Sequence, residues 1–227
     1  MMKAFLGLLY LTICSSYKLL DRKYSSNIID IHIGDCPVDV DHVSMIFEAA
    51  NELTLPGNYR HINWHFDASW KNDTHTNGVN EILFKYIYKE RAYTQFQVLT
   101  EEKSDGSIDT NILEFDMVIN PFGLTYKTLK NIIKHEMTHV FLLGHSEYYD
   151  SISGTTIDVG IRSRKVIQSK NVVKMSQDDC YGVYQKMIDD IIDSYENYEY
   201  AMHLNNVMVL HCPKYAENTE LKNKYGE

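Results

Sequence analysis

The chain has 227 residues and a formal net charge of −9 at neutral pH. A chain of this length can bury a sizeable apolar core as one domain. Its acidic balance argues against a nucleic-acid partner, because the phosphate backbone attracts Lys and Arg. After the first 16 residues, no segment is long and apolar enough to span a membrane. We therefore expect one compact domain without a membrane span.

The N-terminus has the pattern of a secretory signal peptide. Lys3 precedes an apolar run over residues 4–13, and two serines follow where a cleavage site needs small residues. We expect residues 1–16 to be this signal peptide. Residues 17–227 would then be a single secreted, extracellular domain with a C-terminal extension after about residue 195.

Three cysteines remain after residue 16: Cys36, Cys180 and Cys212. In an oxidising compartment, one disulfide and one leftover thiol is the simplest outcome, and the spacing does not say which two pair. Asn72 begins a glycosylation sequon in a polar stretch, and an unused sequon is the equally weighted alternative.

Apolar periodicity predicts the order of elements along the chain. Five strands are expected, at residues 27–33, 62–67, 82–88, 93–100 and 112–120. Three helices are expected, at residues 39–53, from Thr125 as the capping residue to about residue 143, and from Ser176 onward. Between the last two helices, residues 148–171 have no clear period and predict a long loop.

An H-E-x-x-H cluster lies late in the second expected helix. His135 and His139 are four residues apart, so both rings lie on one helix face and can direct a nitrogen at the same metal ion. Glu136 lies beside them, where a proton acceptor is useful. A catalytic zinc takes three protein ligands and keeps a fourth position for water, and His145 is the candidate third ligand. The pattern predicts a catalytic zinc site.

Blander interpretations of these residues exist. The H-E-x-x-H spacing can arise by chance on a solvated helix, although a third histidine and the apolar stripe of the helix make chance less favoured. His145 can be a surface histidine past a helix end, where a basic residue suits the helix dipole. Glu147 and Asp158 are then the candidates for an acidic third ligand.

Two stretches resemble the matrixin branch of the metzincin metalloproteases: residues 135–145 (HEMTHVFLLGH) and 175–184 (MSQDDCYGVY). The second is similar to the Ser-Gln-Asp-Asp start of the final matrixin helix. Glu114, Phe115 and Asp116 stand where the family's fifth strand has His-Phe-Asp. The resemblance implies an α+β zincin fold, in which a twisted, mixed five-stranded sheet carries an active-site helix and a C-terminal helix.

The chain departs from the family pattern in three places. Metzincins have a glycine three residues after the second histidine, where the chain bends, whereas this chain has Leu142; we expect Gly144 to provide the bend instead. The methionine of the family's turn beneath the metal is missing from residues 150–154 (DSISG). Cys36 faintly resembles the cysteine by which matrixin propeptides block zinc, but a structural cysteine or disulfide partner is favoured at its position.

The resemblance implies a secreted zinc-dependent metalloendopeptidase. Zinc would polarise the scissile carbonyl and activate a bound water, and Glu136 would accept the water's proton as general base. A protein or peptide substrate would lie as an extra strand along the sheet edge at residues 93–100. Two other interpretations stay open: a zincin with an acidic third ligand, and a secreted binding protein with a decayed metal site.

Overall fold

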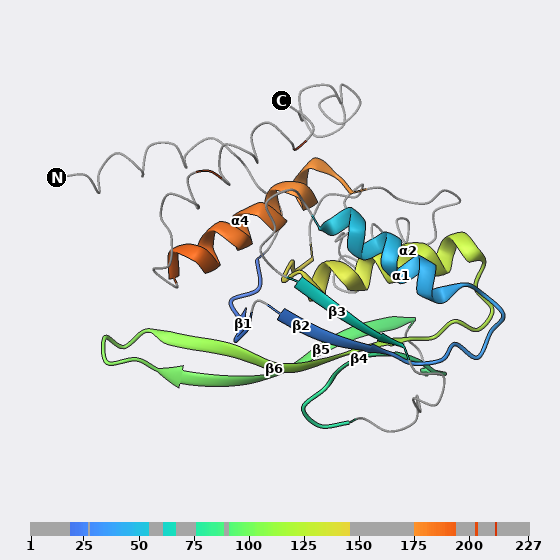
Figure 1. Cartoon of the computed structure of the whole chain (residues 1–227), viewed down its shortest axis with the longest axis horizontal. Helices are drawn as coiled ribbons and strands as arrows, with labels where there is room; N and C mark the ends of the chain where they lie inside the picture. Colours follow the sequence, from blue (N-terminus) through green and yellow to red (C-terminus); the bar gives the residue numbers. More distant parts are fainter. Residues whose placement is uncertain are drawn as a thin grey trace.

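The computed structural model describes residues 19–26, 28–54, 61–66, 76–88, 91–145 and 175–193, together with residues 203 and 212. Within this part the chain is an α+β domain built from one mixed sheet and three helices (Figure 1). The helices are α1 (His42–Leu53), α2 (Tyr126–Val140) and α4 (Gln177–Asp193). All three lie on the same side of the sheet, so the main core forms between the helices and one sheet face.

The six described strands are β1 (Lys23–Tyr24), β2 (Ile28–Ile33), β3 (His61–Phe66), β4 (Asn80–Phe84), β5 (Ala92–Glu102) and β6 (Ile108–Ile119). The long strand β6 organises the sheet. β5 pairs with β6 in antiparallel orientation along the whole length of β6. β1 and β4 pair with different parts of β6 in parallel orientation. Beyond β4 come β2 and then β3, both in parallel pairing. Within the described part, β5, β3 and the short β1 each pair with one strand only, and β5 and β3 are the longer edges of the sheet.

The five expected strands and three expected helices are all present, and the mixed α+β class is confirmed. Two expectations were wrong. The sheet has a sixth strand, β1, whose two residues are too few to show any period. Helix α2 ends at Val140, not near residue 143, because the chain enters a turn there that the apolar pattern does not reveal.

Strand β2 explains how the sheet buries one face. Ile29, Ile31 and Ile33 are buried toward the helices, whereas Ile28 and Asp30 are exposed on the other face. This alternation is the period of two that a half-buried strand requires. Helix α1 covers the same face with a stripe spaced by three and four residues that includes Met45, Ile46, Ala49, Ala50 and Leu53.

The expected pairing of cysteines is confirmed as one disulfide and one thiol. Cys180 in α4 is bonded to Cys212, 32 positions later in the chain, and Cys36 is a buried free cysteine. Closing a loop of this size stabilises a fold by about 3–4 kcal/mol in the chain-entropy model. Cys36 packs in the apolar core, and burial raises the pKa of its thiol, which favours a structural cysteine over a metal-blocking one.

Several predicted features lie outside the described residues. They are the signal peptide at residues 1–16, the sequon at Asn72, the two acidic candidate ligands Glu147 and Asp158, the loop over residues 148–171, and most of the extension after residue 195. In the described part, none of the helices has the length and apolar character that a membrane crossing requires.

Candidate metal centre

Helix α2 brings the first two predicted ligands together. Thr125 is its N-cap, as expected, and its hydroxyl accepts a hydrogen bond from the Thr128 amide at 3.2 Å. From there the helix runs for 15 residues through the core. His135 and His139, one turn apart near its C-terminus, have ring centroids 5.0 Å apart.

His145 completes a three-histidine cluster with them. The candidate ligand nitrogens of His135, His139 and His145 all lie within 4.8 Å of one another. The ring of His145 is centred 5.3 Å from that of His135 and 4.8 Å from that of His139. Because His135 is buried and His145 is exposed, the cluster has one side in the core and one side open to solvent. The three histidines are close enough to bind one metal ion.

The turn after α2 makes this convergence possible. Leu142 has a φ of 67°, in the left-handed region, and its amide donates to the His139 carbonyl at 2.8 Å. The next amide, that of Leu143, donates to the Thr138 carbonyl at 3.0 Å. These two bonds with a left-handed residue between helix and loop make a Schellman motif, which ends the helix and redirects the chain toward His145.

The bend was therefore expected at the wrong residue. Leu142 takes the left-handed conformation, whereas Gly144 is not among the glycines with positive φ. A side chain in this conformation costs about 1–2 kcal/mol. Leu142 is fully buried, and burying a leucine contributes about 1.5–3 kcal/mol, so packing offsets the strain. The bend thus lies two residues before Gly144, on a leucine.

A segment near the N-terminus supports this turn from outside. The Leu20 amide donates to the Leu142 carbonyl at 2.9 Å, and Leu19 forms a β-bridge with Leu143. The Tyr24 hydroxyl donates to the Val140 carbonyl at 2.9 Å. Carbonyls at the end of α2 that lack helical partners are thus satisfied by β1 and the residues before it. Sequence reasoning missed this support, because short polar segments leave no periodic signal.

The orientation of His139 is fixed by its second ring nitrogen. Its Nδ1–H donates to the Leu143 carbonyl at 2.7 Å, so Nε2 is the nitrogen that can bind a metal. Burial lowers the pKa of His139 below its ordinary value, while the bond to Leu143 acts in the opposite direction. The His139 ring therefore stays neutral at a lower pH than an ordinary histidine does, and the neutral ring is the form that binds metals.

Glu136 lies one residue from the first histidine and is buried, with 4% of its surface exposed. The Thr94 hydroxyl, on edge strand β5, donates to Glu136 Oε2 at 2.7 Å. No local pattern singles out Thr94, because its contact with Glu136 joins residues 42 positions apart. A buried carboxylate next to His135 in the helix, held from strand β5, is of the residue type that can accept a proton near a bound metal.

Other histidines gather on the opposite face, near the far edge of the sheet. His65 on β3 binds Asp30 on β2, with its Nε2 2.9 Å from the carboxylate Oδ1, and it stacks on His32 with ring centroids 4.6 Å apart. Asn63 donates to the same Asp30 oxygen at 3.2 Å. The charged and amide partners already present make this group a structural cross-strand cluster.

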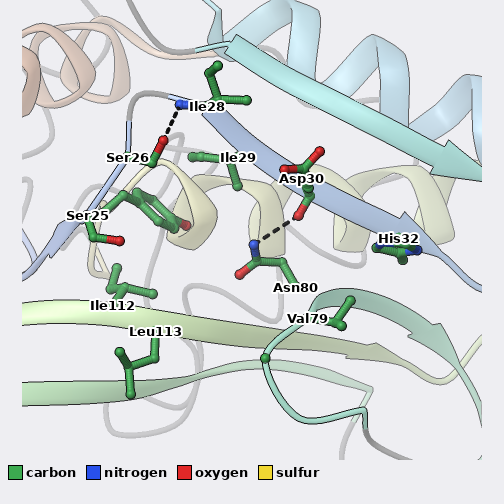
Figure 2. Close-up of a pocket in the computed structure, with 12 residues that line it drawn as sticks. Ser25, Ser26, Ile28, Ile29, Asp30, His32, Val79, Asn80, Ile112 and Leu113 are labelled. Atoms are coloured by element: carbon green, nitrogen blue, oxygen red, sulfur yellow. Dashed lines mark hydrogen bonds between the residues drawn. The ribbon is translucent and has the colours of Figure 1, made fainter.

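A separate pocket of about 220 Å³ lies between β1 and β4, which both pair with β6 (Figure 2). Asn80 bridges the gap: its amide donates to the Asp30 carbonyl at 2.9 Å, and its Oδ1 accepts from the Phe115 amide at 3.1 Å. The Asn80 side chain therefore links β2 to β6 at the start of β4. None of the three clustered histidines lines this pocket, so it is distinct from the candidate metal centre.

Comparison with known proteins gives no match, either to a protein-family model or to a curated protein sequence. The assignment of this centre therefore depends on its residues and their geometry.

Proposed function

We propose that the chain is a secreted zinc-dependent metalloendopeptidase of the metzincin type, similar to the matrixins. The observation that supports this best is the approach of the ligand nitrogens of His135, His139 and His145 to within 4.8 Å of one another. Glu136 follows His135 directly in helix α2. This set contains three ligands and one proton acceptor. It is the minimum that metal-assisted hydrolysis requires.

The donor set fits zinc. Three imidazole nitrogens are ligands that zinc accepts, and a tetrahedral ion held by three of them keeps one position for water or substrate. The three nitrogens lie within 4.8 Å of one another and zinc–nitrogen bonds are about 2.0–2.1 Å long, so one ion could bind all three. The exposed side of the cluster, at His145, leaves room for a substrate to approach.

Bound zinc would supply a Lewis acid that polarises a carbonyl and lowers the pKa of water. Glu136 would accept a proton from the attacking water and return it to the leaving amine, so no covalent intermediate with the protein is needed. His139 keeps its ring oriented through the Leu143 carbonyl, and Thr94 holds Glu136 by one oxygen. Each of these contacts limits the reorganisation that the reaction would demand.

The arrangement of the sheet supports a peptide as substrate. β5 is an edge strand, pairs only with β6 among the described strands, and packs against α2 close to Glu136. An extended peptide can add to such an edge through main-chain hydrogen bonds, which places a backbone carbonyl near the metal. Secretion is supported by the disulfide between Cys180 and Cys212, since such bonds persist in oxidising compartments.

The test uses the secreted protein purified from culture medium. Zinc content should be about one ion per chain, and a mixture of unlabelled peptides followed by mass spectrometry should reveal internal cleavage. A chelator should stop cleavage, and added zinc should restore it. Zinc at one per chain without any cleavage would instead favour a binding protein with a decayed site, and absence of zinc would refute the proposal.

A further inference from the structure

The edge strand contributes one side chain directly to the candidate centre. On β5, Thr94 and Phe96 face the helices, because Phe96 packs against the core and lies beside Phe115. Gln95 points to the other face and donates to Asp116. This alternation directs the Thr94 hydroxyl at α2, where it donates to Glu136 Oε2 at 2.7 Å.

We propose that Thr94 is a positioning residue for Glu136, holding its carboxylate in the orientation needed to accept a proton from water at the metal. The proposal extends the function proposed above and depends on it for its kinetic part. Thr94 itself would touch neither the metal nor the substrate carbonyl. It would act through the hydrogen bond that its hydroxyl donates to Glu136.

The hydroxyl is held in place by both backbone and side chain. Thr94 lies opposite Met117 in the antiparallel ladder between β5 and β6, and its neighbours Tyr93 and Gln95 are paired as well. Threonine is branched at Cβ, which leaves few χ1 rotamers on a strand. Glu136, in contrast, has a long side chain with several rotatable bonds. A rigidly held hydroxyl donor next to a flexible carboxylate limits the orientations that the carboxylate can take.

Burial makes this donor hard to replace. Glu136 has only 4% of its surface exposed, so bulk water cannot freely take the place of a lost hydroxyl. Removal of the Thr94 hydroxyl should therefore change the orientation of the carboxylate. The same substitution should leave the three histidines in place, because His139 is oriented through the Leu143 carbonyl instead.

The experiment compares three variants of the full chain, each loaded with zinc. Thr94→Val keeps the shape of the side chain and loses the hydroxyl, Thr94→Ser keeps the hydroxyl, and Thr100→Val makes the same change at an exposed position further along β5. We expect Thr94→Val to lower kcat about tenfold with KM nearly unchanged. Thr94→Ser and Thr100→Val should stay close to wild type.

A double variant distinguishes a positioning role of Thr94 from general damage to the fold. In Glu136→Ala protein, adding Thr94→Val should cause no further loss of activity, because the acceptor is already missing. Wild-type kcat in Thr94→Val, equal loss in Thr94→Ser, or a further loss in the double variant would each overturn the proposal. If Thr94→Val fails to fold, Thr94→Ala replaces it with the same expected results.

A spectroscopic measurement does not require peptide hydrolysis. Cobalt(II) in place of zinc gives a visible absorption band that depends on the groups around the ion. We expect this band to shift in Thr94→Val and to stay in place in Thr94→Ser and Thr100→Val. If the wild type binds metal but cleaves no peptide, the proposed function fails, and the cobalt spectra alone decide the role of Thr94. Identical spectra in all variants would then refute it.

Discussion

Two groups of histidines in this protein show how surroundings give one residue type different uses. His135, His139 and His145 converge on a common point from a helix and the turn after it. His32 and His65 lie opposite each other on neighbouring strands and stack with their rings 15° from parallel. Both groups bring rings within about 5 Å, so proximity alone does not distinguish them.

The difference lies in what holds each ring. His139 donates to a backbone carbonyl, which leaves its other nitrogen directed at the cluster. His65 instead contacts the carboxylate of Asp30, which Asn63 also binds, and about half of the side chain of each partner is exposed. Asp30 and Asn63 thus hold His65 in a cross-strand cluster, whereas the Leu143 carbonyl fixes the orientation of the His139 ring. This comparison predicts that only the first group binds zinc.

The largest effect should come from removing a ligand on α2. His139→Ala should weaken zinc affinity on the order of a thousandfold and abolish hydrolysis, because one of three bonds to the ion is lost. Zinc titration with a competing chelator measures this. His65→Ala is the matched control and should bind zinc as the wild type does. Full zinc occupancy in His139→Ala would disprove the assignment.

Removing the proton acceptor should separate catalysis from metal binding. Glu136→Ala should keep about one zinc per chain and its thermal unfolding midpoint within a few degrees, yet lose hydrolysis by roughly 10²–10⁴-fold. Metal analysis checks the zinc content, and initial rates on the same sample check the loss of hydrolysis. Undiminished turnover would rule out Glu136 as the general base.

His145 tests whether the exposed member of the cluster is a ligand. His145→Ala should reduce zinc affinity about a hundredfold, less than His139→Ala, because water can occupy the open side more easily. Glu147→Ala and Asp158→Ala should leave affinity nearly unchanged. If an acidic variant lost zinc while His145→Ala kept it, the third ligand would be acidic and the metzincin proposal would fail.

The left-handed turn makes a smaller and more specific prediction. Leu142→Ala should destabilise the fold by about 2–5 kcal/mol, because a buried side chain is lost and the strain remains. Leu142→Gly should be about 1 kcal/mol more stable than Leu142→Ala, the reverse of the usual order, because glycine adopts positive φ without strain. Urea unfolding of both variants measures the difference, and the ordinary order would show that the turn is not left-handed.

The smallest effect concerns pH and the cross-strand pair. Burial lowers the pKa of His32, and the neighbouring His65 lowers it further, while Asp30 opposes both. The folded state then binds a proton at His32 less readily than the unfolded chain does, so this contribution to stability is present above the ordinary histidine pKa and declines as the pH falls below it. NMR titration of the His32 ring should give a midpoint below 6.5, the ordinary value. A midpoint at or above 6.5 would contradict this.

Much of the fold followed from periodicity. Alternating isoleucines placed β2, and apolar residues at spacings of three and four placed α1 and α2, because one buried face imposes these periods. The site followed from spacing: His135 and His139 share a helix face wherever the helix packs. The predicted ends of the helices and strands were less accurate, since a helix can stop wherever its last carbonyls find partners.

The sequence by itself determined which residues can bind a metal, because ligand chemistry and helical spacing are local properties. Only the tertiary structure decided how the third histidine reaches the other two. Leu142 adopts a conformation that its residue type disfavours, and it does so because its side chain is buried and β1 and the residues before it hold the turn. The contact between Thr94 and Glu136 was equally hidden, because it joins a strand and a helix that meet only when the sheet forms. Long-range packing selects among local conformations, and no local pattern records that choice.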